Sequence, residues 1–232
     1  MLKLNGEALE RVTEFNFLGL TIDQHLTWNG HIQKISNKIS RSLGIMNRLK
    51  RFLPKNILRI LYNSLILPHI QYSILVWGHK SSRVFKLQKR AIRLISLSKY
   101  NAHTDPLFKS LNLLKAEDIF NLKALKFYYK YTKNTLPKYF CQMFTRINEQ
   151  HHHETRQLAT QILYQYTTKT SHGQKCIRHI LPSIVNKTPI CISEKISTHS
   201  FNGFSIYSKR YIINKYKEQC EIENCYICRN QN

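Results

Sequence analysis

The strongest constraint on the fold is a repeat of apolar residues at helical spacing within residues 32–46. Successive members are three or four positions apart, so at about 100° per residue they share one face of a helix. This apolar face consists of Ile32, Ile35, Ile39, Leu43 and Met46. The opposite face carries the cations Lys34, Lys38, Arg41 and Arg48. The pattern predicts an amphipathic helix that buries one side and exposes a positively charged one.

A second helix of the same kind is predicted from Ser82 onward. Its apolar face consists of Val84, Leu87, Ala91, Leu94 and Ile95. Across from them lie the cations Lys86, Lys89, Arg90 and Arg93. The Asp105-Pro106 pair has the chemistry of a helix start and predicts a short helix near 107–111, and another helix is predicted over about 115–131. Residues 12–22 instead have the pattern of a short β-hairpin.

Residues 60–77 contain no Lys, Arg, Asp or Glu over 18 positions, which just reaches the lower limit for a membrane span. The stretch nevertheless contains several polar residues and Pro68, and the rest of the chain is polar and basic. These features favour a buried core helix bent at Pro68 over a membrane segment. No membrane is therefore expected among the partners.

After Pro137 the helical period fades and polar residues become more frequent. Three segments there, 161–168, 176–185 and 201–211, fit either strands or short helices. The predicted fold class is therefore mainly α. A short hairpin within residues 1–26 is followed by a helical domain over 27–140 and an irregular α+β tail with cysteines over 141–232.

The scarcity of two residue types excludes common enzyme classes. Only seven glycines are present, and they form no Gly-rich loop of the kind that holds nucleotide phosphates. Aspartate occurs only at Asp23, Asp105 and Asp118, which form no evident carboxylate set for two-metal phosphoryl transfer. The chain is therefore expected not to be an enzyme.

The net charge of +23 indicates a polyanionic partner. Like charges stand four positions apart at Lys34/Lys38 and at Lys86/Arg90, without an interleaved Glu that would compensate them. Phosphates of RNA, DNA or an RNA–DNA hybrid would supply that compensation. Residues 127–131 mix aromatic rings with a lysine, and helical spacing leaves only Tyr128 or Tyr129 as a candidate surface for base stacking.

The cysteines suggest a reducing compartment, nuclear or cytoplasmic, because no cleavable leader is recognisable at the N-terminus. Three of them, Cys220, Cys225 and Cys228, have the spacing of an incomplete zinc knuckle. A closed site needs a fourth ligand, for which His199 is a candidate. The alternative is three free thiols. No cofactor other than this structural zinc is expected.

Several short motifs follow one another in a recognisable order. They are FLG, LTW, HI, SRSLGI, LY, LP, WG and LQKRAIR. In this order, over about residues 12–140, they resemble the region just downstream of the palm in reverse transcriptases of non-LTR retrotransposons of the jockey-like group. The resemblance implies that Phe17, Leu18 and Gly19 belong to a primer-grip hairpin. It also implies that the following helices form a thumb whose basic faces lie along template and primer.

One departure from that family decides the predicted activity. The catalytic signature of an aromatic residue followed by Ala-Asp-Asp has no counterpart in the sequence, and the fingers and most of the palm are missing. The prediction is a non-catalytic fragment of an RNA-directed DNA polymerase that binds template-primer nucleic acid. Its protein partners would be the palm and fingers that it lacks. The alternatives are a protein-interaction module recruited by a host and a decayed remnant without activity.

Overall fold

The computed structural model describes residues 3–8, 10–147 and 163–218. The strands are β1 Lys3–Leu4, β2 Glu7–Ala8, β3 Glu14–Phe17 and β4 Leu20–Asp23. The α-helices are α1 Asn29–Leu49, α2 Lys55–Leu65, α3 Leu67–Gln71, α4 Ile74–Trp77, α5 Ser82–Ser96, α6 Asp105–Ser110, α7 Ala116–Thr132, α8 Lys138–Cys141, α11 Ile177–Asn186, α12 Ile190–Thr198 and α13 Phe201–Asn214. Short 3₁₀ helices, η1 Gly78–Lys80 and η2 Gly173–Lys175, precede α5 and α11. The prediction of a mainly α fold with a short N-terminal hairpin is confirmed.

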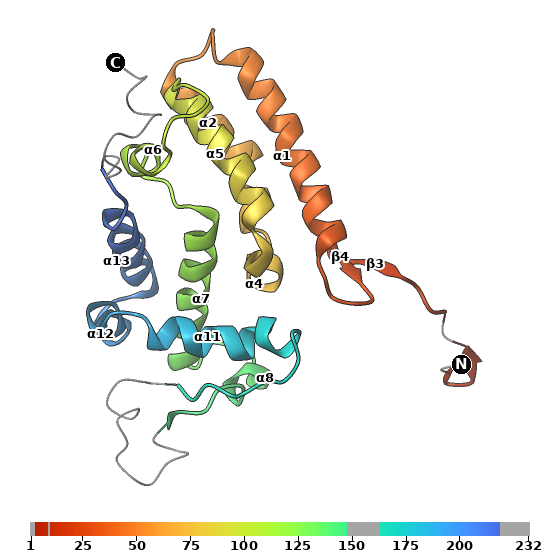
Figure 1. Ribbon diagram of the computed structural model, residues 1–232. Coiled ribbons are helices and arrows are strands. Elements are labelled where there is room, and N and C mark those ends of the chain that lie inside the picture. The colour runs from red at the N-terminus through yellow and green to blue at the C-terminus, as the bar shows by residue number, and fades with distance from the viewer. Residues whose placement is uncertain (1–2, 9, 148–162, 219–232) are drawn as a thin grey trace.

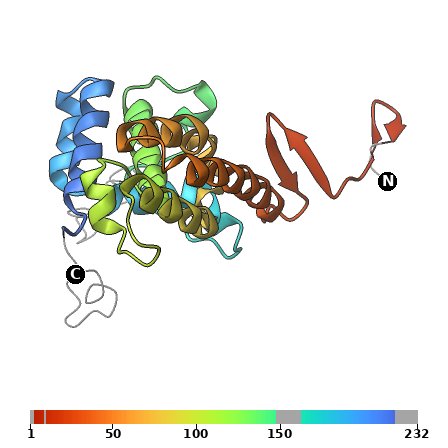
Figure 2. The ribbon, with the colours of Figure 1, turned by 90° about the horizontal axis from the view of Figure 1, so that it is seen from above.

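Strands β3 and β4 form an antiparallel hairpin that extends away from the helical body (Figure 2). Phe17 pairs with Leu20, so Leu18 and Gly19 alone make the turn. Both turn residues have positive φ, 47° and 79°, as a type I′ turn requires. The side chains of β3 are exposed, whereas Thr21 of β4 is buried because β4 packs on α1.

Helices α1 and α5 lie side by side, and α2 packs against both (Figure 1). The predicted apolar faces meet in a common core, where Ile39, Met46, Ala91 and Ile95 are fully buried. Burial of a large apolar side chain stabilises a fold by about 1.5–3 kcal/mol, so these repeats account for the packing of the helices. Both predicted amphipathic helices are confirmed.

A buried amide connects three of these helices. Gln88 of α5 is fully buried and donates from Nε2 to the hydroxyl of Tyr62 on α2 at 2.8 Å and to the Leu114 carbonyl at 2.9 Å. Its Oε1 accepts from the backbone N–H of Ala116, the first residue of α7, at 2.8 Å. Since both polar atoms have partners, the amide fixes how α2, α5 and α7 meet.

Residues 60–77 do not form the single bent helix that the sequence predicted. The segment forms three separate helices, α2, α3 and α4. Pro68 lies in the first turn of α3, where its missing N–H costs little. Ser73, with a φ of 46°, separates α3 from α4. The predicted burial is correct, since Ile70 and Trp77 are fully buried. Within the described ranges, no helix has the length and apolarity needed to cross a membrane.

The later helices pack on α7, which contacts both α11 and α13 (Figure 1). For residues 176–185 and 201–211, the structure decides between strand and helix in favour of helices α11 and α13. Among the described residues beyond α8, β structure consists of an isolated bridge between Arg146 and Leu163. Ile213 and Tyr216 join the core formed by α1, α2 and α5. The predicted domain boundary near residue 140 stays a prediction.

Candidate nucleic-acid interface

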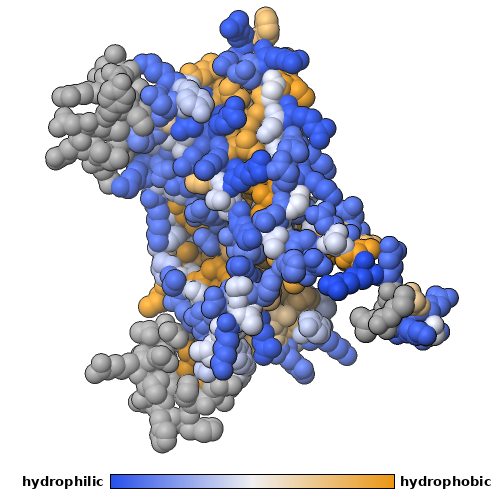
Figure 3. All heavy atoms as spheres, turned by 45° about the vertical axis from the view of Figure 1, so that its right-hand side comes forward, coloured by the Kyte–Doolittle hydropathy of each residue, from blue (hydrophilic) through white to orange (hydrophobic). Residues whose placement is uncertain are grey.

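The cations predicted on α1 form an exposed stripe opposite the buried face. All four of them are exposed, and we call this set the α1 stripe: Lys34, Lys38, Arg41 and Arg48. The buried residues of α1 lie on its other side, so the stripe faces away from the core. The face of the molecule that comes forward with α1 is mostly hydrophilic, with hydrophobic side chains visible between the hydrophilic ones in several places (Figure 3).

A cavity of about 280 Å³ lies where the β3–β4 hairpin meets α1 and α3. We call it the hairpin cavity. Its lining consists of Asn16, Gly19, Thr21, His31, Lys34, Ile35, Asn37, Lys38, Arg41, His69 and Tyr72. The structure therefore brings Gly19 of the predicted grip together with three cations of the α1 stripe. Phe17 and Leu18 are exposed and are not part of this lining.

Two side chains that line the hairpin cavity are held by hydrogen bonds to other residues of the same lining. The Lys34 ammonium donates to Thr21 Oγ1 at 3.0 Å and to Asn16 Oδ1 at 3.3 Å. His31 is buried, its Nδ1 accepts from the Thr21 N–H at 3.4 Å, and its ring meets Trp77 edge-on. Burial lowers the pKa of His31, and the charges of Lys34 and Lys38 lower it further. The lowered pKa favours the neutral imidazole, and the lysines and Arg41 supply the positive charge of the cavity.

The junction between the hairpin and α1 depends on residues that sequence reasoning did not single out. The Asp23 carboxylate accepts the backbone N–H groups of Thr27 at 2.9 Å, Trp28 at 2.8 Å and His25 at 3.1 Å. Desolvation raises the pKa of Asp23, but these hydrogen bonds outweigh it and hold the pKa below its ordinary value. The Tyr72 hydroxyl donates to the Leu18 carbonyl and so ties the turn of the hairpin to α3.

A second cavity, of about 580 Å³, lies between α1 and α5. We call it the helix cavity. Its lining consists of Ser40, Leu43, Gly44, Asn47, Lys50, Arg51, Arg90, Arg93, Leu94, Leu97, Ser98 and Tyr100. Two predicted cations, Arg90 and Arg93, thus meet Lys50 and Arg51. The sequence pattern did not include the latter two because they follow the last helical residue of α1, where helical periodicity no longer assigns a face.

The four cations predicted on α5 do not act as one equivalent set. Arg93 is half-buried, and its Nε donates to the Ala102 carbonyl at 2.8 Å, so this guanidinium also has a structural role. Lys89 is half-buried and covers the ring of Phe85 at 4.4 Å. Lys86 is exposed but lines neither cavity. Arg90, exposed and on the helix cavity, is the α5 cation whose placement best fits the predicted role.

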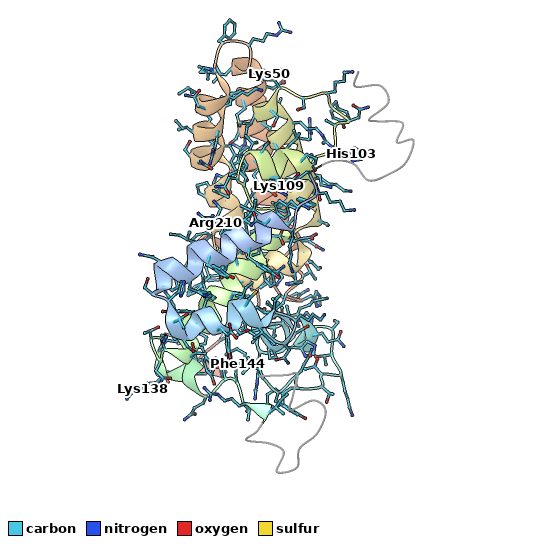
Figure 4. All side chains as sticks on the ribbon, turned by 90° about the vertical axis from the view of Figure 1, so that its left-hand side faces the viewer. Lys50, His103, Lys109, Lys138, Phe144 and Arg210 are labelled. Carbon is cyan, nitrogen blue, oxygen red and sulfur yellow. The ribbon has the colours of Figure 1, made fainter. Side chains whose placement is uncertain are left out.

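Carboxylates lie elsewhere in the molecule. Neither cavity has an Asp or Glu in its lining. Within the described part of the chain, the ion pairs join Lys115 to Asp105 at 2.7 Å and Lys109 to Glu218 at 2.8 Å. Figure 4 shows Lys109 together with Arg210 on the face that carries α13. The cations around the two cavities are therefore not neutralised by acidic residues of the described ranges.

Neither candidate for base stacking on α7 lies at the surface. Tyr128 and Tyr129 are both buried, because α11 and α13 cover α7. Tyr129 packs on Phe204 at a ring distance of 5.1 Å and donates its hydroxyl to the His199 carbonyl at 2.8 Å. These rings belong to the core of the tail helices and cannot stack on a base.

The predicted zinc ligands Cys220, Cys225 and Cys228 lie outside the described residues. Among the residues described, no group of three or more His, Cys, Asp or Glu side chains could hold a metal ion. His199, the candidate fourth ligand, follows α12, and its Nδ1 lies 2.9 Å from the Thr198 hydroxyl. The zinc site stays a prediction.

Two relatives from Drosophila melanogaster were found among curated proteins. One is a probable RNA-directed DNA polymerase from transposon BS, 26% identical over 125 residues. The other is the RNA-directed DNA polymerase from mobile element jockey, 26% identical over 124 residues. Half of this chain is thus related to retrotransposon reverse transcriptases. The matches confirm the resemblance predicted from the FLG and LQKRAIR motifs.

The reverse transcriptase-related part covers 50% of this chain but only 14% and 13% of the two relatives. No family model and no solved structure matches the chain. The relationship accordingly concerns a limited stretch of a much longer polymerase.

Proposed function

We propose that this chain holds RNA, DNA or an RNA–DNA hybrid against α1 and α5 and does not polymerise by itself. The observation that carries the proposal is the group of cations around the hairpin and helix cavities, with no carboxylate in either lining. Neutralising phosphates with such cations releases condensed counterions and so favours binding, most strongly at low salt. The relationship to RNA-directed DNA polymerases supports a nucleic-acid ligand over another polyanion.

The placement of the aspartates supports the absence of polymerase activity. Asp23 lies at the hairpin, at the opposite end of the molecule from α6, which begins at Asp105 (Figure 1). Asp105 is paired with Lys115, and Asp118 accepts a hydrogen bond from the Tyr216 hydroxyl. Two-metal phosphoryl transfer needs carboxylates that converge on ions about 4 Å apart. Asp105 and Asp118 interact electrostatically, but each has a protein partner and Asp23 lies apart from both, which supports the proposal that the chain does not polymerise.

Two measurements on the purified chain test the proposal. Binding to a fluorescent primed template should be detectable at low salt and should weaken linearly in a plot of log affinity against log salt. With Mg²⁺ and deoxynucleotides, the primer should not be extended beyond a control without protein. Undetectable binding at low salt, or affinity that does not change with salt, would contradict the nucleic-acid role. Extension of the primer would contradict the non-catalytic one.

A second candidate function, protein interaction, is favoured by the exposed hairpin. Phe15, Phe17 and Leu18 are 58%, 54% and 74% exposed, and the hairpin lies at the edge of the helical body (Figure 2). We propose that this surface meets the palm and fingers of the parent polymerase inside the cell, in the nucleus or the cytoplasm. The double variant Phe15→Ser, Phe17→Ser should then bind a palm-and-fingers protein, added in trans, more weakly than the unmodified chain does. Its nucleic-acid binding should be unchanged. A remnant without activity would show neither interaction.

A further inference from the structure

The helix cavity differs from the α1 stripe in shape and in chemistry. The stripe is a row of exposed charges, whereas the helix cavity is a hollow with apolar walls. Leu43, Leu94 and Leu97 supply apolar surface inside it, and Lys50, Arg51 and Arg90 supply positive charge. Its volume of about 580 Å³ lies within the 300–1,000 Å³ typical of small-molecule sites. It can therefore take a ligand that has both an apolar body and an anionic group.

The polar lining adds a further requirement on that ligand. Ser40, Asn47 and Ser98 offer donors and acceptors beside the leucines, which suits a flat group with hydrogen-bonding edges. Tyr100 also lines the cavity and is 81% exposed, so one face of its ring is open to a planar partner. A nucleobase combines a π face with polar edges, and its phosphate supplies the negative charge.

The shape of the helix cavity also indicates whether the bound nucleic acid is paired or unpaired. In a duplex, bases are stacked and paired, so a duplex presents only its phosphates to a protein surface such as the α1 stripe. An apolar hollow between two helices can be filled only by a base that has left its stack. We infer that the helix cavity binds one unpaired nucleotide, with its base between Leu43 and Leu94 and its phosphate at Lys50, Arg51 and Arg90. This inference rests on the proposed function, because it assigns the class of nucleic acid that α1 and α5 recognise.

The cavity is also preorganised. Helices α1 and α5 pack along each other, and the hydrogen bond from Arg93 to the Ala102 carbonyl fixes the loop that carries Tyr100. Leu97 ends α5 in a left-handed conformation, with a φ of 55°, which turns the chain toward that loop. A site whose walls are already ordered loses little conformational entropy on binding, so affinity is retained for a ligand as small as one nucleotide.

Gly44 gives the inference a direct test. It lines the helix cavity, and no heavy atom lies within 4 Å of the position a Cβ would take. Gly44→Leu therefore projects a side chain into the hollow from a Cβ that meets no other atom, and leucine has a higher helix propensity than glycine, so the variant should fold. The control is Asn202→Leu, which adds the same side chain at an exposed position of α13, outside the cavity. Circular dichroism melting checks that both variants are folded.

Binding is measured by fluorescence anisotropy with a short single-stranded oligouridylate and with an RNA duplex of equal charge. Gly44→Leu should weaken single-strand binding roughly tenfold, the order expected for loss of one base contact, and leave duplex binding within about twofold. Tyr100→Ala should weaken single-strand binding in the same direction. Asn202→Leu should change neither affinity.

The outcomes separate this inference from the proposed function. Equal losses for both ligands, or no loss for either, overturn the single-nucleotide site while the nucleic-acid role stands. If the unmodified chain binds neither ligand, the proposed function itself fails. As a further arm, an oligoglutamate peptide competes with the oligouridylate. If the peptide competes in the unmodified chain but not in Gly44→Leu, the occupant of the helix cavity is an acidic peptide. That result would also overturn the inference.

Discussion

Replacing Lys38, Arg41 and Arg48 by glutamine tests whether the α1 stripe contacts phosphates. All three side chains are exposed, and glutamine has nearly the same helix propensity as lysine and arginine, so the fold should be retained. Each duplex phosphate contact contributes about 0.9 to the slope of log affinity against log salt. Loss of three contacts should therefore lower the slope by about 2.7. Between about 50 and 200 mM salt, the unmodified chain should then lose roughly 40 times more affinity than the variant.

The assay is anisotropy of a labelled RNA–DNA hybrid at a series of salt concentrations. The matched control replaces three other exposed cations by glutamine: Lys138, Lys187 and Arg210. Figure 4 shows Lys138 and Arg210 at separate places along the face that carries α13. The control removes the same net charge, so it reports any effect of the overall field. If both triple variants lower the slope equally, the α1 stripe has no special contact with phosphates and the reasoning is refuted.

Four further predictions concern the fold and the ligand. Gln88→Leu leaves the Tyr62 hydroxyl, the Leu114 carbonyl and the Ala116 N–H unpaired in the core, and should lower the free energy of unfolding by about 3 kcal/mol in urea denaturation. Burial raises the pKa of Tyr62 to about 12, so an ultraviolet titration should contain a phenol step near that pH that Tyr62→Phe lacks. The pKa of Asp23 is lowered, so its stabilisation is complete above the ordinary value of 3.8 and is lost as the pH falls through the lower native value. The difference in unfolding free energy between Asp23→Ala and the unmodified chain should accordingly shrink in acid. Lys38 and Lys50 are separated by about 18 Å along the axis of α1, which is the length of on the order of five stacked nucleotides. Affinity should therefore rise steeply once single strands reach that length. A smooth rise would contradict joint use of the two cavities.

Much of the helical fold could be predicted because its signals are local. On α1 and α5 the apolar residues recur every three or four positions. The repeat therefore marks the one side of each helix that packs against the core. The same reasoning failed on α7, which has neighbours on several sides. The exposed positions of such a helix do not form one continuous face, so helical spacing left Tyr128 and Tyr129 as surface candidates although both are buried.

The break between α3 and α4 shows what local signals omit. Nothing in the sequence around Ser73 marks a left-handed residue. Two hydrogen bonds hold the chain beside Ser73: a local one, from Trp77 Nε1 to the Tyr72 carbonyl at 3.0 Å, and a distant one, from the Tyr72 hydroxyl to the Leu18 carbonyl 54 positions earlier. The contact with Leu18 exists only after the hairpin has docked, and a pattern of apolar residues cannot reveal it.

The candidate site shows the same division between charge and shape. A helical repeat distinguishes a buried side from an exposed one, which is why the α1 stripe could be predicted. What lies on either flank of that exposed side depends on which elements pack beside α1. Lys38 and Gly44 are six positions apart, which at about 100° per residue places them roughly 120° apart around α1. Lys38 faces the cavity made with the hairpin, and Gly44 faces the cavity made with α5. Because the two flanks are formed by different elements, a substitution can close one cavity and leave the other, so the proposed contact with phosphate and the proposed contact with a base can be tested separately on one helix.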